Sequence, residues 1–269
     1  MQCNNSIWFG KDKRQEQLDD YVVNKETANF GFEKMHETEK ESRVCRHFNS
    51  VAANYDMMNT LLSFGIHYLW KQTGIKMLKL KPGDKVLDVC GGTGDLSVSA
   101  SKIIGPSGQA VLYDINWEMM KAGRFKNTNA DYRKNIIYVQ GDAEIISFPD
   151  NTFDAVMVGY AMRNLTHMKQ GFSEMHRVLK PGGRFVCLEF SKPVFPWFRL
   201  LYDFYSFKIM PWLGDLIVGS KTAYTCLPET IRLFPLPDEL SSILEKIGFS
   251  KVEYKIMTNG ISVVHAGEK

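Results

Sequence analysis

Hydrophobic and polar positions follow different patterns in three parts of the chain. Residues 1–43 are polar and mixed in charge with few apolar side chains, which predicts a largely flexible N-terminal arm. Over residues 44–80, apolar side chains recur every three to four positions, and this spacing predicts helices. After Pro82 and Gly83 the pattern changes to short apolar runs separated by amphipathic stretches. We therefore expect an arm followed by one domain over residues 44–269.

The short apolar runs predict the strands of an α/β domain. Five of them alternate with helical stretches, the first of which is Asp95–Ile104, and two more form a hairpin around Asn259-Gly260 after a last helix at 238–247. The runs are residues 86–89, 110–114, 132–140, 153–159, 184–190, 249–256 and 261–266. Strands that alternate with helices form a parallel sheet, and right-handed crossovers then place a ligand crevice at the carboxyl ends of the first and fourth strands.

A glycine-rich turn follows the first predicted strand and reads Cys90-Gly91-Gly92-Thr93-Gly94-Asp95. Glycines allow positive φ and close backbone approach, and the N–H groups that begin the next helix face the same ligand space. A dinucleotide fingerprint reads G-x-G-x-x-G and has its acid on the second strand, whereas Asp88 here precedes the glycines at the tip of the first strand. The turn therefore does not match a dinucleotide site.

This arrangement favours S-adenosylmethionine instead. The methionine end of that cofactor carries an amino group and a sulfonium, whose positive charges Asp88 and Asp95 can offset, and it has no pyrophosphate. The alternative is an ordinary tight turn between a strand and a helix. Because acids at both ends of a G-G-x-G turn are uncommon, we expect a cofactor site formed by Asp88, Gly91, Gly92, Thr93, Gly94 and Asp95.

The overall composition argues against several classes of partner and location. Thirty-three basic and thirty acidic residues give a net charge of +3, which is too small and too evenly spread for a nucleic-acid-binding surface. The five cysteines are far apart and fit neither a disulfide framework nor zinc-ligand spacing. We see no targeting segment and no apolar run of the roughly 18 residues that span a bilayer. The expectation is a cytoplasmic protein that contacts a membrane only peripherally.

Several motifs occur together between about Phe30 and His265. They are Asn29-Phe30-Gly31-Phe32-Glu33, Tyr55-Asp56-Met57-Met58-Asn59, Ser63-Phe64-Gly65-Ile66-His67, the turn from Gly91 to Asp95, Arg163-Asn164, and Arg177-Val178-Leu179-Lys180-Pro181-Gly182-Gly183. With these motifs the chain resembles the class I S-adenosylmethionine-dependent methyltransferases, and more narrowly the ubiquinone/menaquinone biosynthesis C-methyltransferases. The resemblance implies a Rossmann-like α/β fold with a seven-stranded, mostly parallel sheet that has one antiparallel strand and is flanked by helices.

The same resemblance implies an activity and a location. The activity is S-adenosylmethionine-dependent C-methylation of a polyprenylated benzoquinol, a demethylmenaquinol, or both. The location is the cytoplasm, in peripheral contact with the inner membrane. A homodimer and contacts with other enzymes of quinone biosynthesis are left open as partners. Two other functions are also left open, namely methylation of another small hydrophobic molecule, such as a sterol or a phenolic O-acceptor, and non-catalytic binding in a quinone pathway.

Further cofactor contacts are expected at the ends of the second and third strands. Asp114 ends the second strand, where a carboxylate can accept two hydrogen bonds from vicinal ribose hydroxyls, and its alternative role is a helix N-cap. The resemblance implies that Asp142 accepts a hydrogen bond from the adenine amine while Ala143 contacts the ring. Asn116 is expected to flank the cofactor.

The expected chemistry needs alignment and an electron-rich acceptor carbon rather than a metal, and the sequence has no metal-ligand cluster. Loss or polarisation of a phenolic proton moves electron density onto the neighbouring ring carbon. Arg163 and Asn164 match the family's substrate-orienting pair, and Tyr55 matches its Tyr-Asp motif. Since arginine is a poor base, we expect Arg163 to stabilise a phenolate while water takes the proton. The alternatives are a salt bridge for Arg163 and helix packing for Tyr55.

Residues 192–219 contain more aromatic surface than one packing face needs. The large apolar side chains are Phe195, Trp197, Phe198, Leu201, Phe204, Tyr205, Phe207, Met210 and Trp212. We expect a hydrophobic lid over the substrate that contacts lipid or the polyprenyl tail, with Arg199 and Lys208 at its polar edge. Packing within a helical core is the alternative for part of the set.

Overall fold

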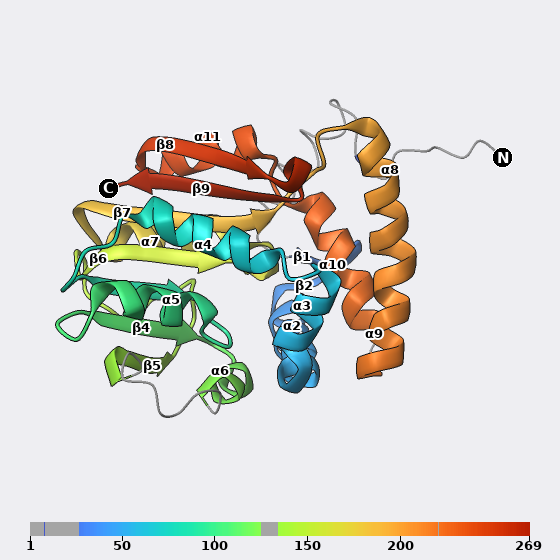
Figure 1. Cartoon of the computed structure of the whole chain (residues 1–269), viewed down its shortest axis with the longest axis horizontal. Helices are drawn as coiled ribbons and strands as arrows, with labels where there is room; N and C mark the ends of the chain where they lie inside the picture. The colour runs from blue at the N-terminus through green and yellow to red at the C-terminus, as the bar shows by residue number, and fades with distance from the viewer. Residues whose placement is uncertain (1–7, 9–26, 125–133, 220) are drawn as a thin grey trace.

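A computed structural model describes Trp8 and residues 27–124, 134–219 and 221–269. Its centre is a seven-stranded sheet in the order β5-β4-β3-β6-β7-β9-β8, with helices on both faces (Figure 1). The strands are β3 (Lys85–Val89), β4 (Gln109–Asp114), β5 (Ile136–Gln140), β6 (Phe153–Gly159), β7 (Leu179–Phe190), β8 (Ser250–Met257) and β9 (Ser262–Glu268). Neighbouring strands are parallel except where β9 pairs with β7 and β8. The predicted Rossmann-like sheet with one antiparallel strand is confirmed.

The ends of the strands differ in places from those predicted. β6 and the helix α5 (Asp95–Ile104) have the predicted bounds. β5 begins at Ile136, inside the predicted range 132–140. Residues 132 and 133 of that range lie outside the described ones. β7 begins at Leu179 rather than at residue 184. The reason is pairing with both neighbours, because Leu179 pairs with Phe153 of β6. On the other side, Gly182 N donates to the Lys269 carbonyl at 2.9 Å and Lys269 N donates to the Gly183 carbonyl at 3.2 Å.

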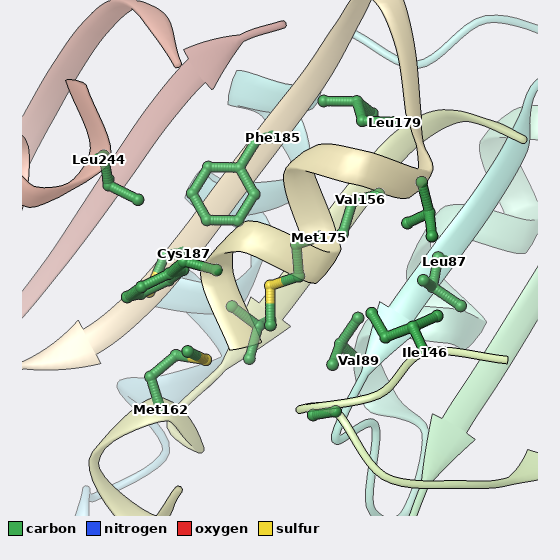
Figure 2. Close-up of a cluster of buried hydrophobic side chains, with 14 of the residues drawn as sticks. Leu87, Val89, Ile146, Val156, Met162, Met175, Leu179, Phe185, Cys187 and Leu244 are labelled. Carbon is green, nitrogen blue, oxygen red and sulfur yellow. The ribbon is translucent and has the colours of Figure 1, made fainter. Parts of the chain in front are cut away.

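The hydrophobic core forms on both faces of the sheet because successive strand residues point to opposite sides. On one face, Val86 and Leu112 pack against α4 (His67–Leu78), α5 and α6 (Trp117–Arg124). On the other, Leu87 and Phe185 pack against α7 (Met168–Val178) and α11 (Pro237–Ile247). Figure 2 shows this second cluster, in which Met175 of α7 lies between strand side chains. The parallel strands are thus covered on both faces, as buried parallel strands require.

The N-terminal part of the domain starts earlier than predicted. Residues that we assigned to the arm form the hairpin β1 (Thr27–Phe30) and β2 (Glu33–His36), and the helix expected from residue 44 is α2 (Glu37–Val51). Phe30 and Met35 are buried against Cys226 of α10 (Lys221–Leu233). This partner lies about 190 residues away in the sequence, so the local polar pattern gave no sign of it. Residues 27–43 thus form regular structure packed on the domain where an arm was expected.

Trp8 also has a fixed place against the body of the protein. Its indole is only 5% exposed, and Nε1 donates a hydrogen bond to Asp203 Oδ1 at 3.2 Å. The ring lies over the guanidinium of Arg232, which is 1% exposed and forms an ion pair with Asp203. A cation held against an aromatic face loses less solvation energy than one buried among aliphatic groups. The remaining residues of the predicted arm before Thr27 lie outside the described ones.

The predicted lid is a continuous helical column at the side of the molecule (Figure 1). It consists of α8 (Pro196–Phe204), the π-helical turn η4 (Tyr205–Ile209) and α9 (Met210–Val218). A run of large apolar side chains on this column is more than half exposed, namely Trp197, Leu200, Leu201, Phe204, Trp212 and Leu216. No helix within the described ranges is long and apolar enough to cross a membrane.

Candidate active site

Two connected cavities lie at the carboxyl ends of β3, β4 and β6, where the strand order predicted a ligand crevice. The larger has a volume of about 530 Å³ and the smaller about 260 Å³. They share several lining residues, namely Val44, Phe48, Tyr55, Cys90, Gly92, Gly159, Tyr160 and Asn164. α2, α3 (Tyr55–Leu62) and α4 contribute to the walls, together with the helical column on the side of the larger cavity.

Twelve of the thirteen residues predicted for the site line these cavities. The larger cavity has Asp88, Gly91, Thr93, Asp95 and Arg163, the smaller has Asp114, Asn116, Asp142 and Ala143, and both have Tyr55, Gly92 and Asn164. Gly94 is the exception. It precedes α5 with a φ of 84°, and a Cβ there would come within 2.8 Å of Leu112. Its role in this structure is to allow the turn to pass under β4.

The glycine turn is fixed by contacts from three directions. Gly91 N donates to the Tyr113 carbonyl at 3.2 Å and Gly92 N donates to Asp114 Oδ2 at 2.8 Å, so β4 holds the first half of the turn. The Thr93 hydroxyl donates to Asp56 Oδ1 of α3 at 2.7 Å. α6 approaches so closely that a Cβ on Gly123 would come within 2.1 Å of the Thr93 carbonyl oxygen. The turn backbone is thus placed by the sheet and by two helices.

Asp88 lies beneath the turn rather than on its surface. Its side chain is fully buried, and Oδ2 accepts hydrogen bonds from Ser97 N at 2.9 Å and Ser97 Oγ at 2.6 Å. Oδ1 is buried with no hydrogen-bond partner among the described residues. Burial raises the pKa of Asp88 to about 7, although the bonds from Ser97 act in the opposite direction. This carboxyl therefore supports the first turn of α5 and titrates close to neutral pH.

Asp95 already has a basic partner. Its Oδ2 lies 2.6 Å from Nζ of Lys71, which extends from α4 to the start of α5. The Lys71 side chain is only 15% exposed. Burial lowers the pKa of Lys71, but the attraction of Asp95 outweighs it and the pKa is raised, so the amine is protonated. The larger cavity thus holds a complete ion pair beside the glycine turn.

The smaller cavity carries the acids predicted for the adenosine end. Asp114 accepts hydrogen bonds from Gly92 N and, at 2.7 Å, from Asn116 N, and burial raises its pKa. The Asn116 amide donates to Asn49 Oδ1 at 2.9 Å while its oxygen accepts from Met119 N, so it joins α2 to the start of α6. Asp142 accepts from Glu144 N at 2.8 Å, which shapes the loop beside Ala143.

Arg163 is held by a buried acid at the end of β7. Its side chain and that of Glu189 are 7% and 3% exposed, and NH1 lies 2.9 Å from Glu189 Oε2. The same NH1 donates to the Tyr160 carbonyl, and the guanidinium lies 5.2 Å from the centre of the Phe190 ring. The salt bridge that we considered as an alternative therefore exists, and Arg163 also lines the larger cavity. Asn164 and Tyr55 lie where the two cavities meet.

Sequence analysis missed Lys71 and Glu189. A signal for Glu189 was present, because an acid near the end of the fifth predicted strand repeats the pattern of Asp88 and Asp114. Lys71 gave no such signal, since a lysine on an amphipathic helix is usually exposed. Its partner Asp95 belongs to another element 24 residues later.

The donors and acceptors of the two cavities fit the parts of S-adenosylmethionine. Asp114 and Asp142 at one end match ribose hydroxyls and an amine, and the acids beside the glycine turn match cationic groups. The turn itself leaves the backbone of Gly91 and Gly92 bare toward the larger cavity. The residues present therefore suit this cofactor, while their individual roles stay predictions.

Solved structures with the same fold include methyltransferases. A methyltransferase from Aquifex aeolicus described as dependent on S-adenosylmethionine has a TM-score of 0.54 at 20% identity over 73% of this chain and 88% of that one. Phosphoethanolamine N-methyltransferase 2 of Haemonchus contortus, solved with S-adenosylmethionine, has a TM-score of 0.53 at 16% identity over 74% and 52% of the two chains. These likenesses show that the chain shares the fold of S-adenosylmethionine-dependent methyltransferases.

The chain belongs to the ubiE/COQ5 methyltransferase family, whose model matches residues 36–269, and it is thus an S-adenosylmethionine-dependent methyltransferase. Ubiquinone/menaquinone biosynthesis C-methyltransferase UbiE of Haemophilus ducreyi is 47% identical over 91% of this chain and 94% of its own length. The enzyme of the same name from Pasteurella multocida is 44% identical over 95% and 96%. The family resemblance seen in the sequence is confirmed, and it extends over nearly the whole described domain.

The raised pKa of Asp88 leads to a prediction for pH dependence. The pKa of Asp88 is about 7 in the folded protein and 3.8 for an ordinary aspartate, so the protonated carboxyl favours the folded state. As the pH rises from about 4 through 7 the folded state loses this stability, by about 1.4 kcal/mol for each pH unit between the two pKa values. The free energy of unfolding of the wild type minus that of Asp88→Asn should therefore become more negative between pH 4.5 and 7.5, as measured by urea unfolding.

Asp154→Asn is the matched control, because Lys180 lowers the pKa of Asp154 and its effect on stability changes only at lower pH. The corresponding difference for Asp154→Asn should stay nearly constant over the same range. A constant difference for Asp88→Asn as well would contradict a raised pKa at Asp88.

Proposed function

We propose that the protein methylates a ring carbon of a polyprenylated benzoquinol, a demethylmenaquinol, or both, in ubiquinone/menaquinone biosynthesis. The names of the relatives support this assignment. The observation that carries it is the lining of the larger cavity, where Arg163, Asn164 and Tyr55 occur together with the glycine turn and with large apolar side chains. A flat ring with a polar edge fits the polar groups, and its tail fits the apolar ones.

The residues around the ring would act by orientation and electrostatics. S-Adenosylmethionine, when bound, supplies an electrophilic methyl group. Arg163 places N–H donors of fixed geometry at the cavity wall, where they stabilise negative charge on a phenolic oxygen and so raise the electron density of the neighbouring carbon. Tyr55 and Asn164 add groups that can hydrogen-bond to the same ring. Because a guanidinium does not accept a proton at neutral pH, water is the proposed proton acceptor.

Glu189 is proposed to position Arg163 rather than to contact the substrate. Its Oε2 holds NH1 at 2.9 Å and its Oε1 accepts from the Arg163 backbone N at 3.4 Å. This double attachment fixes both ends of the arginine, so the guanidinium meets a ligand without first losing side-chain freedom. The pair also compensates the cost of burying the cation.

The apolar part of the larger cavity is proposed to bind the polyprenyl tail. Phe198, Leu201 and Tyr202 of α8 line it, together with Leu227 and Ile231 of α10. Each buried CH₂ group of a ligand contributes about 0.8 kcal/mol, so a few isoprene units outweigh the contacts of the ring in affinity. The ring contacts then determine orientation.

The exposed face of the helical column is proposed to lie on the membrane that supplies the substrate. Its large apolar side chains continue across to Phe64, which is 80% exposed and whose ring centre lies 6.3 Å from that of Tyr205. The Tyr205 hydroxyl donates to the Leu62 carbonyl at 2.9 Å, so the column and the end of α3 are joined at this point. An apolar face of this kind beside a cavity mouth suits peripheral binding to lipid.

The direct test of this function is incubation of the purified protein with S-adenosylmethionine and a reduced polyprenyl benzoquinol or demethylmenaquinol. A product heavier by one methyl group on a ring carbon, located by fragmentation in mass spectrometry, is expected with at least one of them. Methylation on oxygen, or of neither quinol while a sterol or simple phenol is methylated, would contradict the proposal.

Arg163→Lys should lower kcat by about 10- to 100-fold and leave the affinity for S-adenosylmethionine unchanged. The ammonium keeps the charge but loses the planar donor group that holds a phenolic oxygen. Turnover by the assay above and titration calorimetry measure the two quantities. Arg184→Lys, which changes a partly exposed ion pair with Glu268 on the sheet, is the matched control. Wild-type turnover in Arg163→Lys would remove this arginine from the substrate site.

Phe198→Ser and Phe204→Ser separate tail binding from membrane binding, because Phe198 lines the cavity whereas Phe204 is 62% exposed. Phe198→Ser should raise KM for a long-tailed quinol in detergent about tenfold more than for a truncated analogue. Phe204→Ser should leave the ratio of the two KM values unchanged and weaken co-sedimentation with phosphatidylethanolamine/phosphatidylglycerol vesicles. Ile103→Ser on α5, which also removes a partly exposed apolar side chain, is the control for vesicle binding. If all three variants changed the KM ratio and vesicle binding equally, Phe198 and Phe204 would have only a structural role.

A further inference from the structure

Basic side chains are scarce in the two cavities. The described residues that line the cavities include one lysine, Lys71, and one arginine, Arg163, and both line the larger cavity. Burial and the nearby basic side chains lower the pKa of His47 and His67, which line the same cavity, so these imidazoles are neutral. Arg163 is held by Glu189 on the side proposed for the quinol. Lys71 is thus the cation available on the side of the glycine turn.

Lys71 is also placed to contact a ligand. It lines the larger cavity with Gly91, Gly92 and Asp95, and its ammonium group has three N–H donors, one of which is directed to Asp95 at 2.6 Å. An anionic group that leaves water for a mostly apolar cavity needs a positive partner. The methionine end of S-adenosylmethionine carries such a group, its α-carboxylate, next to an α-ammonium.

We propose that the Lys71–Asp95 ion pair binds the zwitterionic end of the cofactor, with Lys71 Nζ on the α-carboxylate and Asp95 on the α-ammonium. This inference deepens the proposed function and rests on its cofactor. Opposite charges then face each other across the contact, and neither member of the pair needs to lose its partner. The pair also joins α4 to the first residue of α5, so the contact is made by two elements already fixed against the glycine turn.

The proposal has a consequence that a purely structural ion pair lacks. If Lys71 contacts the carboxylate, the protein distinguishes S-adenosylmethionine from its decarboxylated form, which keeps the adenosine, the sulfonium and the amine. If the pair only fastens α4 to α5, removal of Lys71 weakens both ligands alike. Binding of 5′-methylthioadenosine, which has neither charged group of the amino acid, reports whether the adenosine end of the site is intact.

The experiment measures binding of these three ligands by titration calorimetry to the wild type, Lys71→Gln, Asp95→Asn and Lys180→Gln. The wild type should bind S-adenosylmethionine at least about tenfold more tightly than the decarboxylated form, the effect of one charge-assisted hydrogen bond. Lys71→Gln should reduce this ratio to below about threefold and leave the affinity for 5′-methylthioadenosine unchanged. Asp95→Asn should weaken the two amine-bearing ligands together and keep the ratio.

Lys180→Gln is the matched control, because Lys180 also lies 2.6 Å from an aspartate, Asp154, but does not line either cavity. It should bind all three ligands as the wild type does. Lys71→Arg keeps the positive charge and should retain the preference for S-adenosylmethionine over its decarboxylated form. If circular dichroism shows that Lys71→Gln is unfolded, Lys71→Arg takes its place. A folded Lys71→Arg that has lost the preference but still binds 5′-methylthioadenosine would count against a charge contact.

Two results would overturn the inference while the proposed function stands. One is a wild type that binds S-adenosylmethionine and its decarboxylated form equally, and the other is an unchanged ratio in Lys71→Gln. A wild type that binds none of the three ligands would overturn the cofactor assignment as well. Binding by the wild type therefore tells a failure of the ion-pair inference from a failure of the cofactor assignment.

Discussion

The position of the glycine turn between β3 and α5 is the constraint on which the rest of the site depends. Its backbone passes so close to Leu112 and to Gly123 that side chains on either side are excluded. Once the turn is fixed, so are the acids at the ends of β3 and β4, because Asp114 accepts a hydrogen bond from Gly92 within the turn and Asp88 accepts one from Ser97 in the first turn of α5. A site for a cofactor with several charged and polar parts requires this kind of fixed spacing. The sheet supplies the spacing, and the helices above it supply the enclosure.

Much of the sheet and of the cofactor end could be predicted from the sequence, because their signals are local. Apolar runs of strand length, a glycine-rich turn and acids just after strands are all visible within ten residues or fewer. The starts of β5 and β7 were predicted less well, and that of β7 depends on pairing with Phe153 of β6 and on hydrogen bonds to Lys269, both distant in sequence. Local pattern thus determines which elements form, while distant partners determine where they end.

The parts that could not be predicted depend on pairs that are distant in sequence. The hairpin at 27–36 is polar along most of its length and is held by a few side chains that meet α10. Lys71 and Glu189 sit in an amphipathic helix and a buried strand, and each becomes part of the site only because an oppositely charged side chain from another element reaches it. Buried charges need such partners, so whether a charged side chain is buried beside the site is decided by the tertiary structure. Sequence patterns identify residues that their own strand or turn brings to the cavities, but not those whose place depends on a partner from another element.

The π-helical turn η4 has a consequence for the phase of the helical column. Along an ordinary α-helix each residue turns by about 100°, so Trp212 and Leu216 would be rotated from Trp197 by about 60° and 100°. A π-turn adds one residue without the corresponding rotation, which shifts these positions back by about 100° and brings Leu216 to about the same direction as Trp197. All three side chains are more than 60% exposed. The inserted residue therefore keeps the exposed apolar side chains of α8 and α9 on one side of the column. Deletion of one residue from 205–209 would leave their relative direction unchanged, whereas an ordinary α-helical segment that kept all five residues would rotate α9 by about 100°.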